Sequence, residues 1–210
     1  MNYYPVHICL QDKIVTIIGG GKIAQRKIAL LLKTNATIII ISPSITQTIE
    51  DWVKKNKVEW RKKMFEPSDI IGSHLVFALT NNAEVNKGVL DATTSHQWVN
   101  IATDRNKSTF HVPAQIQQGP LSITVSTAGI SPTISKNLVK QIKQTIPDNV
   151  IEHLQFLKRW RETIQQTIHH DEARHHLLRY LASDELLTAA NREEKAHAAY
   201  CKVLKEYGDE

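Results

Sequence analysis

Residues 13–32 read KIVTIIGGGKIAQRKIALLL and set the architecture of this chain. The β-branched run Lys13–Ile18 precedes the glycines Gly19–Gly21, and apolar residues then recur at helical spacing over Ala24–Leu32. This order predicts a strand, a tight turn and a helix. A second run, Ala36–Ile41, is continuous rather than alternating, which is typical of a parallel strand covered on both faces. Together these segments predict a β-α-β unit.

The same alternation continues along the first half of the chain. Three more strand-like runs and two helical patterns follow: strands at Val58–Arg61, Leu75–Ala78 and Val99–Ala102, and helices near Ile45–Lys55 and Ala83–Ser95. Strands that alternate with helices predict an α/β fold with a Rossmann-type, doubly wound parallel sheet. We expect this domain to occupy residues 1–112.

The character of the sequence changes near Phe110. Phe110–Ala114 and Leu121–Ser126 are expected to be two strands joined across Gly119-Pro120, followed by a helix that Ser131 caps and Pro132 begins. We assign residues 113–146 to a small separate segment. From Pro147 the chain shows no convincing strand, so residues 147–210 are expected to form a helical C-terminal domain.

The composition excludes several classes of protein. No apolar run approaches the roughly 18 residues that a membrane helix needs, so no membrane span is expected. The N-terminus lacks the basic and apolar segments of a secretory signal. The two cysteines, Cys9 and Cys201, lie at opposite ends of the chain and match no disulfide framework. These features predict a cytoplasmic protein.

The charge balance favours a small anionic ligand over nucleic acid. Against 26 Lys and Arg stand 21 Asp and Glu, which gives a net charge of +5 at pH 7. The basic residues are spread along the chain, and aromatic residues make up only 6%, so no basic surface with stacking aromatics is indicated. A polyanionic small molecule is the expected partner.

The glycine turn matches G-x-G-x-x-[GA] between a strand and a helix, which is the context that a dinucleotide-binding loop requires. Gly19 permits the tight turn, Gly21 lets a diphosphate approach the backbone, and Ala24 allows close packing of helix on strand. Lys22 and Ile23 open the helix, whose first N–H groups can bind the diphosphate. The alternative is a structural glycine turn that binds no cofactor.

Two further segments are candidates for cofactor contact. At the end of the second strand, Pro43 and Ser44 stand where an acidic residue usually binds the ribose, and no arginine beside them would hold a 2′-phosphate. This favours NAD over NADP as the cofactor. Thr80 and Asn81 follow the strand Leu75–Ala78 and are expected either to contact the cofactor or to cap the next helix.

Taken together, five segments resemble the precorrin-2 dehydrogenase family of sirohaem synthesis in order and spacing. They are residues 19–27, 78–81, 99–102, 110–114 and 126–132. The resemblance covers residues 1 to about 140 and implies NAD-dependent oxidation of the tetrapyrrole precorrin-2 to sirohydrochlorin. It also implies a homodimer in which residues 113–146 cross between subunits. In the helical tail the resemblance rests on length and position.

Two other functions stay open at this point. Some members of this family also insert ferrous iron into sirohydrochlorin, and the alternative is that this chain is such a bifunctional enzyme. In those members an aspartate follows the strand that corresponds to Val99–Ala102, whereas Thr103 stands at that position here. The second alternative is a module that binds NAD as a sensor and catalyses nothing.

The nearest acid to that position is Asp104, one residue later. A shift of one residue at a strand end can direct a side chain to the opposite face. We hypothesise that Asp104 lies beside the nicotinamide and accepts a proton as hydride leaves the substrate. The competing interpretation is an aspartate in a surface loop.

The resemblance also suggests where substrate carboxylates could bind. Thr127 and Ser131, with the backbone N–H groups at the start of the following helix, could form a small anion-binding corner, although capping of that helix would also explain Ser131. Lys136 is a candidate for steering the acidic substrate, and a solvated helix face is the alternative for this lysine. His169–His176 contains four histidines, but a polar helix face explains it, and no metal site is predicted.

Overall fold

The computed structural model describes residues 3–207, which form two compact units that divide between Val112 and Pro113. The first unit contains five strands, three α-helices and two short 3₁₀ helices. They are β1 (Ile14–Ile18), α1 (Lys22–Leu31), β2 (Thr37–Ile41), α2 (Gln47–Lys54), β3 (Glu59–Arg61), η1 (Pro67–Ile70), β4 (Leu75–Ala78), α3 (Ala83–Ala92), β5 (Trp98–Ile101) and η2 (Arg105–Lys107).

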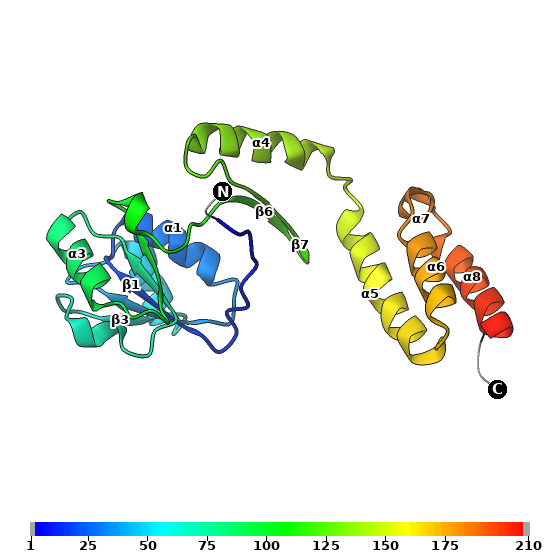
Figure 1. Cartoon of the computed structure of the whole chain (residues 1–210), viewed down its shortest axis with the longest axis horizontal. Coiled ribbons are helices and arrows are strands. Elements are labelled where there is room, and N and C mark those ends of the chain that lie inside the picture. Colours follow the sequence, from blue (N-terminus) through cyan, green and yellow to red (C-terminus); the bar gives the residue numbers. More distant parts are fainter. Residues whose placement is uncertain (1–2, 208–210) are drawn as a thin grey trace. The chain divides into compact units, whose positions relative to one another are not determined.

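The five strands form one sheet in the order β3-β2-β1-β4-β5, and every neighbouring pair is parallel (Figure 1). Successive parallel strands need a crossover connection, and α1, α2 and α3 supply three of these. The expected Rossmann-type α/β fold is confirmed.

Each face of the sheet has its own hydrophobic core. On one face, Ile28 of α1 and Ile49 of α2 pack with Ile17 of β1. On the other face, Ile18 of β1 packs with Val89 of α3. Neighbouring residues of β1 thus enter different cores because side chains alternate across a strand. Burial on both faces explains why β1, β2 and β4 are apolar at nearly every position.

The strand register brings the carboxyl ends of four strands to one edge. Ile18 at the end of β1 lies opposite Ile41 of β2 and Ala78 of β4, and Ile41 in turn lies opposite Arg61 of β3. The segments that follow these residues therefore leave the sheet side by side. This edge is where α/β sheets of this type bind ligands.

The second unit begins with an antiparallel hairpin and continues with helices. Its elements are β6 (Ala114–Gln118), β7 (Leu121–Val125), α4 (Pro132–Thr145), α5 (Val150–Thr167), α6 (Asp171–Leu181), α7 (Asp184–Thr188) and α8 (Arg192–Tyr207). Figure 1 shows α4 lying along the hairpin, and α4 contacts both of its strands. Helices α5 to α8 share a separate core around Phe156, Ile164 and Leu181. The division of this unit at residues 146 and 147 stays a prediction.

One expected strand lies elsewhere in the chain. The sequence predicted a strand over Phe110–Ala114, but β6 begins at Ala114. Pro113 has no N–H to donate to the ladder, and the pairing with β7 begins one residue later, at Ala114. Phe110 instead packs edge-on against Phe77 in the first unit, with ring centroids 5.2 Å apart. Across residues 3–207, no helix combines the length and apolar character that a membrane crossing needs.

Candidate functional site

A cavity of about 610 Å³ opens at the carboxyl edge of the sheet. It is lined by the last residues of β1 and β2, by the segments that follow β1 to β4, and by one residue of α3: residues 18–23, 41–46, 63–65, 79–82 and 85. Eight of the nine residues predicted to bind a cofactor line it: Gly19, Gly21, Lys22, Ile23, Pro43, Ser44, Thr80 and Asn81. The ninth, Ala24, is fully buried between α1 and the sheet, as close packing of helix on strand requires.

The three glycines of the turn have different surroundings. Gly19 has a φ of +114°, and a Cβ there would lie 2.8 Å from the carbonyl oxygen of Leu79. A Cβ on Gly20 would lie 2.2 Å from the carbonyl oxygen of Ser44. A Cβ on Gly21 would meet no heavy atom within 4 Å. Packing therefore requires glycine at Gly19 and Gly20, whereas Gly21 leaves its backbone open toward the cavity it lines.

The first turn of α1 has backbone N–H groups that could bind an anion. Its N-cap residue is Gly21, and no side chain in the described part of the chain caps this helix. By contrast, Thr46 caps α2 and Asn82 caps α3 with side-chain oxygens. The first turn of α1 also contains no acidic residue and begins with Lys22. Its N–H groups and the positive end of the helix dipole therefore face the cavity without a protein anion to neutralise them.

The loop after β2 forms a fixed wall of the cavity. The Ser42 hydroxyl donates to the carbonyl oxygen of Ser44 at 2.6 Å, and the indole N–H of Trp60 donates to the carbonyl oxygen of Ser42 at 2.9 Å. Pro43 and Ser44 themselves are exposed. These bonds hold the backbone in place and leave the outer surface of the loop accessible.

The opposite wall is held by a buried amide. The side chain of Asn86, which is 1% exposed, accepts hydrogen bonds from the backbone N–H and the hydroxyl of Thr80 at 3.3 and 2.8 Å. Its amide nitrogen donates to the Thr80 carbonyl at 2.9 Å and to the Thr103 hydroxyl at 3.1 Å. The side chain of Asn82 caps α3, so neither Thr80 nor Asn81 is the N-cap of this helix.

Asp104 lies outside this network and is not among the residues that line the cavity. It is the N-cap of η2, where its carboxylate accepts from the N–H of Asn106 at 3.0 Å and pairs with Lys107 at 3.1 Å. The hydrogen bond from Lys107 lowers the pKa of Asp104, so the carboxylate is ionised at neutral pH. The neighbouring Thr103, and not Asp104, is joined to the wall of the cavity.

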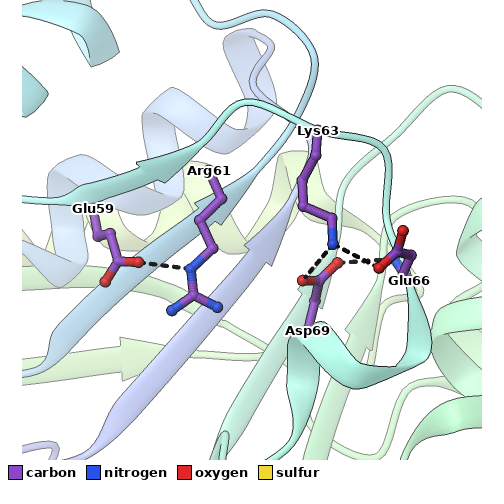
Figure 2. Close-up of polar contacts among 5 residues, drawn as sticks. All are labelled: Glu59, Arg61, Lys63, Glu66 and Asp69. Atoms are coloured by element: carbon purple, nitrogen blue, oxygen red, sulfur yellow. Dashed lines mark hydrogen bonds and ion pairs between the residues drawn. The ribbon is translucent and has the colours of Figure 1, made fainter.

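Sequence reasoning missed the contribution of β3. Lys63, Met64 and Phe65 follow this strand and line the cavity. The sequence predicted a strand that ends at Arg61, as β3 does, and the parallel register brings the residues after it to the same edge. No motif marks residues 63–65 as ligand contacts, so the sequence did not point to them. Figure 2 shows Lys63 held between the carboxylates of Glu66 and Asp69, at 2.7 and 3.2 Å.

The predicted substrate-binding residues belong to the second unit. Thr127 and Ser131 lie together: the Thr127 hydroxyl donates to the Ser131 carbonyl at 3.0 Å and accepts from the Ser131 N–H at 3.1 Å. Ser131 also caps α4 by accepting from the N–H of Ile134, and Pro132 has no N–H to offer. These bonds occupy much of the proposed anion-binding corner. Lys136 is exposed on α4.

In the histidine-rich segment His169–His176, His170 has a structural role. His170 caps α6 through Nδ1 and lies against Tyr207, with ring centroids 4.7 Å apart. His175 and His176 are exposed on α6. Within residues 3–207, no group of three or more His, Cys, Asp or Glu is arranged to hold a metal ion.

The residues of the cavity fit a nicotinamide dinucleotide. An uncapped helix start, an open glycine backbone and the absence of a first-turn acid suit a diphosphate. The adjoining wall after β2 offers backbone and hydroxyl groups to a ribose. The carboxyl edge of this sheet therefore has the features that a dinucleotide site requires.

Comparison with known proteins agrees with this geometry. Residues 6–114 match the family model described as "Putative NAD(P)-binding". The chain is 32% identical over 166 residues to a siroheme synthase of Actinobacillus pleuropneumoniae, which covers 79% of this chain and 34% of that protein. It is 29% identical over 157 residues to a precorrin-2 dehydrogenase of Bacillus subtilis, covering 75% of this chain and 97% of that protein.

A solved structure is similar over nearly the whole chain. The protein named "SirC, precorrin-2 dehydrogenase" shares 26% identity and a TM-score of 0.82, covering 97% of this chain and all of that one. The match spans about a third of the length of the siroheme synthase and nearly all of the Bacillus enzyme. The family model covers more than half of the sequence, from before β1 to the start of β6. The chain therefore belongs to this NAD(P)-binding family, and the resemblance to precorrin-2 dehydrogenases is confirmed.

Proposed function

We propose that this protein oxidises precorrin-2 to sirohydrochlorin with NAD as the hydride acceptor. The observation that carries the proposal is the cavity at the uncapped start of α1, where Gly21 leaves the backbone open. The reaction is supported by the names of the similar proteins, and above all by the Bacillus enzyme, which this chain matches over almost its full length.

The roles of the residues follow from their positions in the cavity. The backbone of residues 19–24 would bind the diphosphate, because its N–H groups face the cavity at the positive end of α1. Pro43 and Ser44 would contact the adenosine ribose, and Thr80 and Asn81 would contact the cofactor from the opposite wall. When bound, the nicotinamide ring supplies the hydride chemistry that no side chain can perform.

Removal of hydride from the substrate is accompanied by loss of a proton, and a base must receive it. We assign this role to Asp104, which follows the end of β5 and lies outside the lining of the nucleotide cavity, so it would act on a substrate bound beside that cavity. Thr103 would support it indirectly, because its hydroxyl connects β5 to Asn86 and Thr80.

The substrate is a macrocycle rich in carboxylates, and the chain carries a net charge of +5. A positive protein attracts such a molecule at long range. Thr127, Ser131 and Lys136 are our candidates for carboxylate binding. We also propose that the protein works as a cytoplasmic homodimer.

The test is turnover under anaerobic conditions. Purified protein is mixed with precorrin-2 and NAD, and the absorbances of reduced nicotinamide and of sirohydrochlorin are followed together. We expect both products to appear in equal amounts. Binding of NAD without any turnover would contradict the proposal and would support the NAD-sensing alternative.

A further inference from the structure

Three consecutive cations follow the middle of β3, and each is engaged by a neighbour. Arg61 donates to the Glu59 carboxylate at 2.6 Å, and the Lys62 ammonium lies 5.8 Å from the centroid of the Trp60 ring. Lys63 pairs with two carboxylates, those of Glu66 and Asp69 (Figure 2). Of these three cations, only Lys63 lines the cavity.

Lys63 lies next to the segment that would hold the adenosine ribose. Ile41 is opposite Arg61 in the parallel register, and the N–H of Ser42 donates to the Arg61 carbonyl at 3.4 Å. Lys63 follows Arg61 by two residues, just as Pro43 follows Ile41. Both residues line the same cavity. In folds of this type the residues beside the end of the second strand distinguish a ribose 2′-hydroxyl from a 2′-phosphate.

The two carboxylates that hold Lys63 are themselves fixed by η1. Asp69, whose side chain is 6% exposed, accepts from the backbone N–H of Glu66 at 2.8 Å, and the Glu66 side chain caps the same 3₁₀ helix in return. This reciprocal capping box sets both acids against the lysine ammonium. The hydrogen bond from Lys63 to Glu66 raises the pKa of the lysine, which therefore stays charged.

We propose that the pairing of Lys63 with Glu66 and Asp69 determines cofactor specificity, by excluding the 2′-phosphate of NADP and admitting NAD. This inference rests on the proposed function, because it concerns the same cofactor cavity. A phosphate that approached Lys63 would meet a cation already neutralised by two acids, and the carboxylates would repel its negative charge. A ribose with a free 2′-hydroxyl carries no charge and meets no such repulsion.

The experiment compares NAD and NADP binding to the full-length protein by titration calorimetry. In Glu66→Gln the amide keeps an acceptor for the cap of η1 but no longer neutralises Lys63. Since Glu66 is exposed, we expect NADP to bind about three- to fivefold more tightly in this variant. In Asp69→Asn, where the lost charge is buried, we expect a gain of about tenfold. NAD affinity should change by less than about twofold in both variants.

Two control variants isolate the role of Lys63. Glu59→Gln removes an acid of β3 that pairs with Arg61 outside the cavity. This variant should leave the ratio of NAD affinity to NADP affinity unchanged. The double variant Lys63→Gln/Glu66→Gln should lose the gain in NADP affinity, because no cation is released. Thermal unfolding of each variant shows whether it is folded, and Glu66→Gln still tests the proposal if Asp69→Asn does not fold.

The outcomes separate this inference from the proposed function. Tight NAD binding by the wild type supports the role of Lys63 if NADP binding improves in Glu66→Gln and stays unimproved in Glu59→Gln and in Lys63→Gln/Glu66→Gln. Tight NAD binding with an unchanged ratio in Glu66→Gln overturns this inference and leaves the proposed function standing. A wild type that binds neither nucleotide overturns both.

Discussion

At the scale of single residues, the glycine turn combines two different requirements. Gly20 fits against the loop after β2, where a Cβ would overlap the Ser44 carbonyl. Gly21 contacts nothing that a Cβ would reach, although it lines the cavity. Gly20 is therefore required by packing, whereas Gly21 leaves space for a ligand.

These two glycines give the first prediction. Gly20→Ala should lower the free energy of unfolding by about 2 kcal/mol or more, since the Ser44 backbone must shift to admit the methyl group. Gly21 has a φ of −83°, which alanine adopts freely. The free energy of unfolding of Gly21→Ala should therefore stay within about 1 kcal/mol of the wild-type value. NAD affinity of Gly21→Ala should fall at least about tenfold.

Urea unfolding and NAD titration of the two variants measure these effects. Equal destabilisation by both substitutions would contradict the division of roles, as would normal NAD binding by Gly21→Ala.

Asp104 gives the second prediction at this scale. If Asp104 is the proton acceptor, Asp104→Asn should reduce kcat by about 100-fold or more while NAD affinity is unchanged. The asparagine can still accept from the N–H of Asn106, so the cap of η2 survives. Lys107→Gln is the matched control, because it breaks the ion pair and keeps the carboxylate. Full turnover by Asp104→Asn would leave Asp104 a capping residue only.

The sequence predicts which residues line the cavity where a motif fixes the backbone, and it does not identify residues that act through burial. The glycine motif and the strand ends correctly led to one cavity edge, because parallel register brings these segments together. Asn86 has no motif and is recognisable only from its burial between Thr80 and Thr103. Lys63 becomes informative only through its two acidic neighbours.

At the scale of elements, α1 differs from the helices beside it. Thr46 and Asn82 satisfy N–H groups at the starts of α2 and α3, and α1 has no such cap among the described residues. Serine, threonine, aspartate and asparagine are the usual caps, and a helix without one keeps unpaired donors in its first turn. This difference distinguishes the helix that we propose to bind the diphosphate, and the sequence indicates it at Gly21.

The hairpin shows where element boundaries could not be predicted. Residues 114–118 read AQIQQ, and a segment so rich in glutamine does not stand out as a strand. The apolar residues around Val112 do, so the sequence predicted the strand over Phe110–Ala114 instead. The structure begins β6 after Pro113 because proline cannot donate to the ladder. The helices after Pro147 were easier, since their apolar spacing is helical and Gly208 is the only glycine there.

A buried histidine in α5 gives a prediction for the helices α5–α8. His153 is 5% exposed, and neither ring nitrogen has a hydrogen-bond partner within residues 3–207. Burial, with a smaller contribution from the positive charge of Arg192, lowers the pKa of His153 below its ordinary value of 6.5. The unfolded chain therefore binds a proton more readily than the folded one. Stability should fall as the pH decreases from about 6.5 toward the folded-state pKa.

Urea unfolding followed by circular dichroism, measured across this pH range, checks the expectation. His153→Leu should flatten the pH dependence, whereas the control His175→Gln changes an exposed histidine of α6 and should leave it intact. An identical slope in wild type and His153→Leu would show that His153 does not cause the effect.

At the scale of the whole molecule, we predict assembly through α4. Ile134 and Leu138 are 53% and 39% exposed, and their spacing of four residues places them on one face of α4. Ile130, which is 88% exposed, precedes this helix. An apolar face of this kind is typical of a protein interface. Light scattering should give twice 23.8 kDa for the wild type and a lower mass for Ile134→Glu. A wild-type monomer would contradict the homodimer.

The proposed function and cofactor specificity depend on binding of a pyridine nucleotide's diphosphate at the start of α1, and a crystal structure of the protein with saturating NAD would reveal that binding. We expect the diphosphate to lie against Gly21 and the first-turn N–H groups of α1, with the adenosine ribose beside Ser44. NAD bound elsewhere on the protein, or a cavity that stays without nucleotide at saturation, would contradict this expectation.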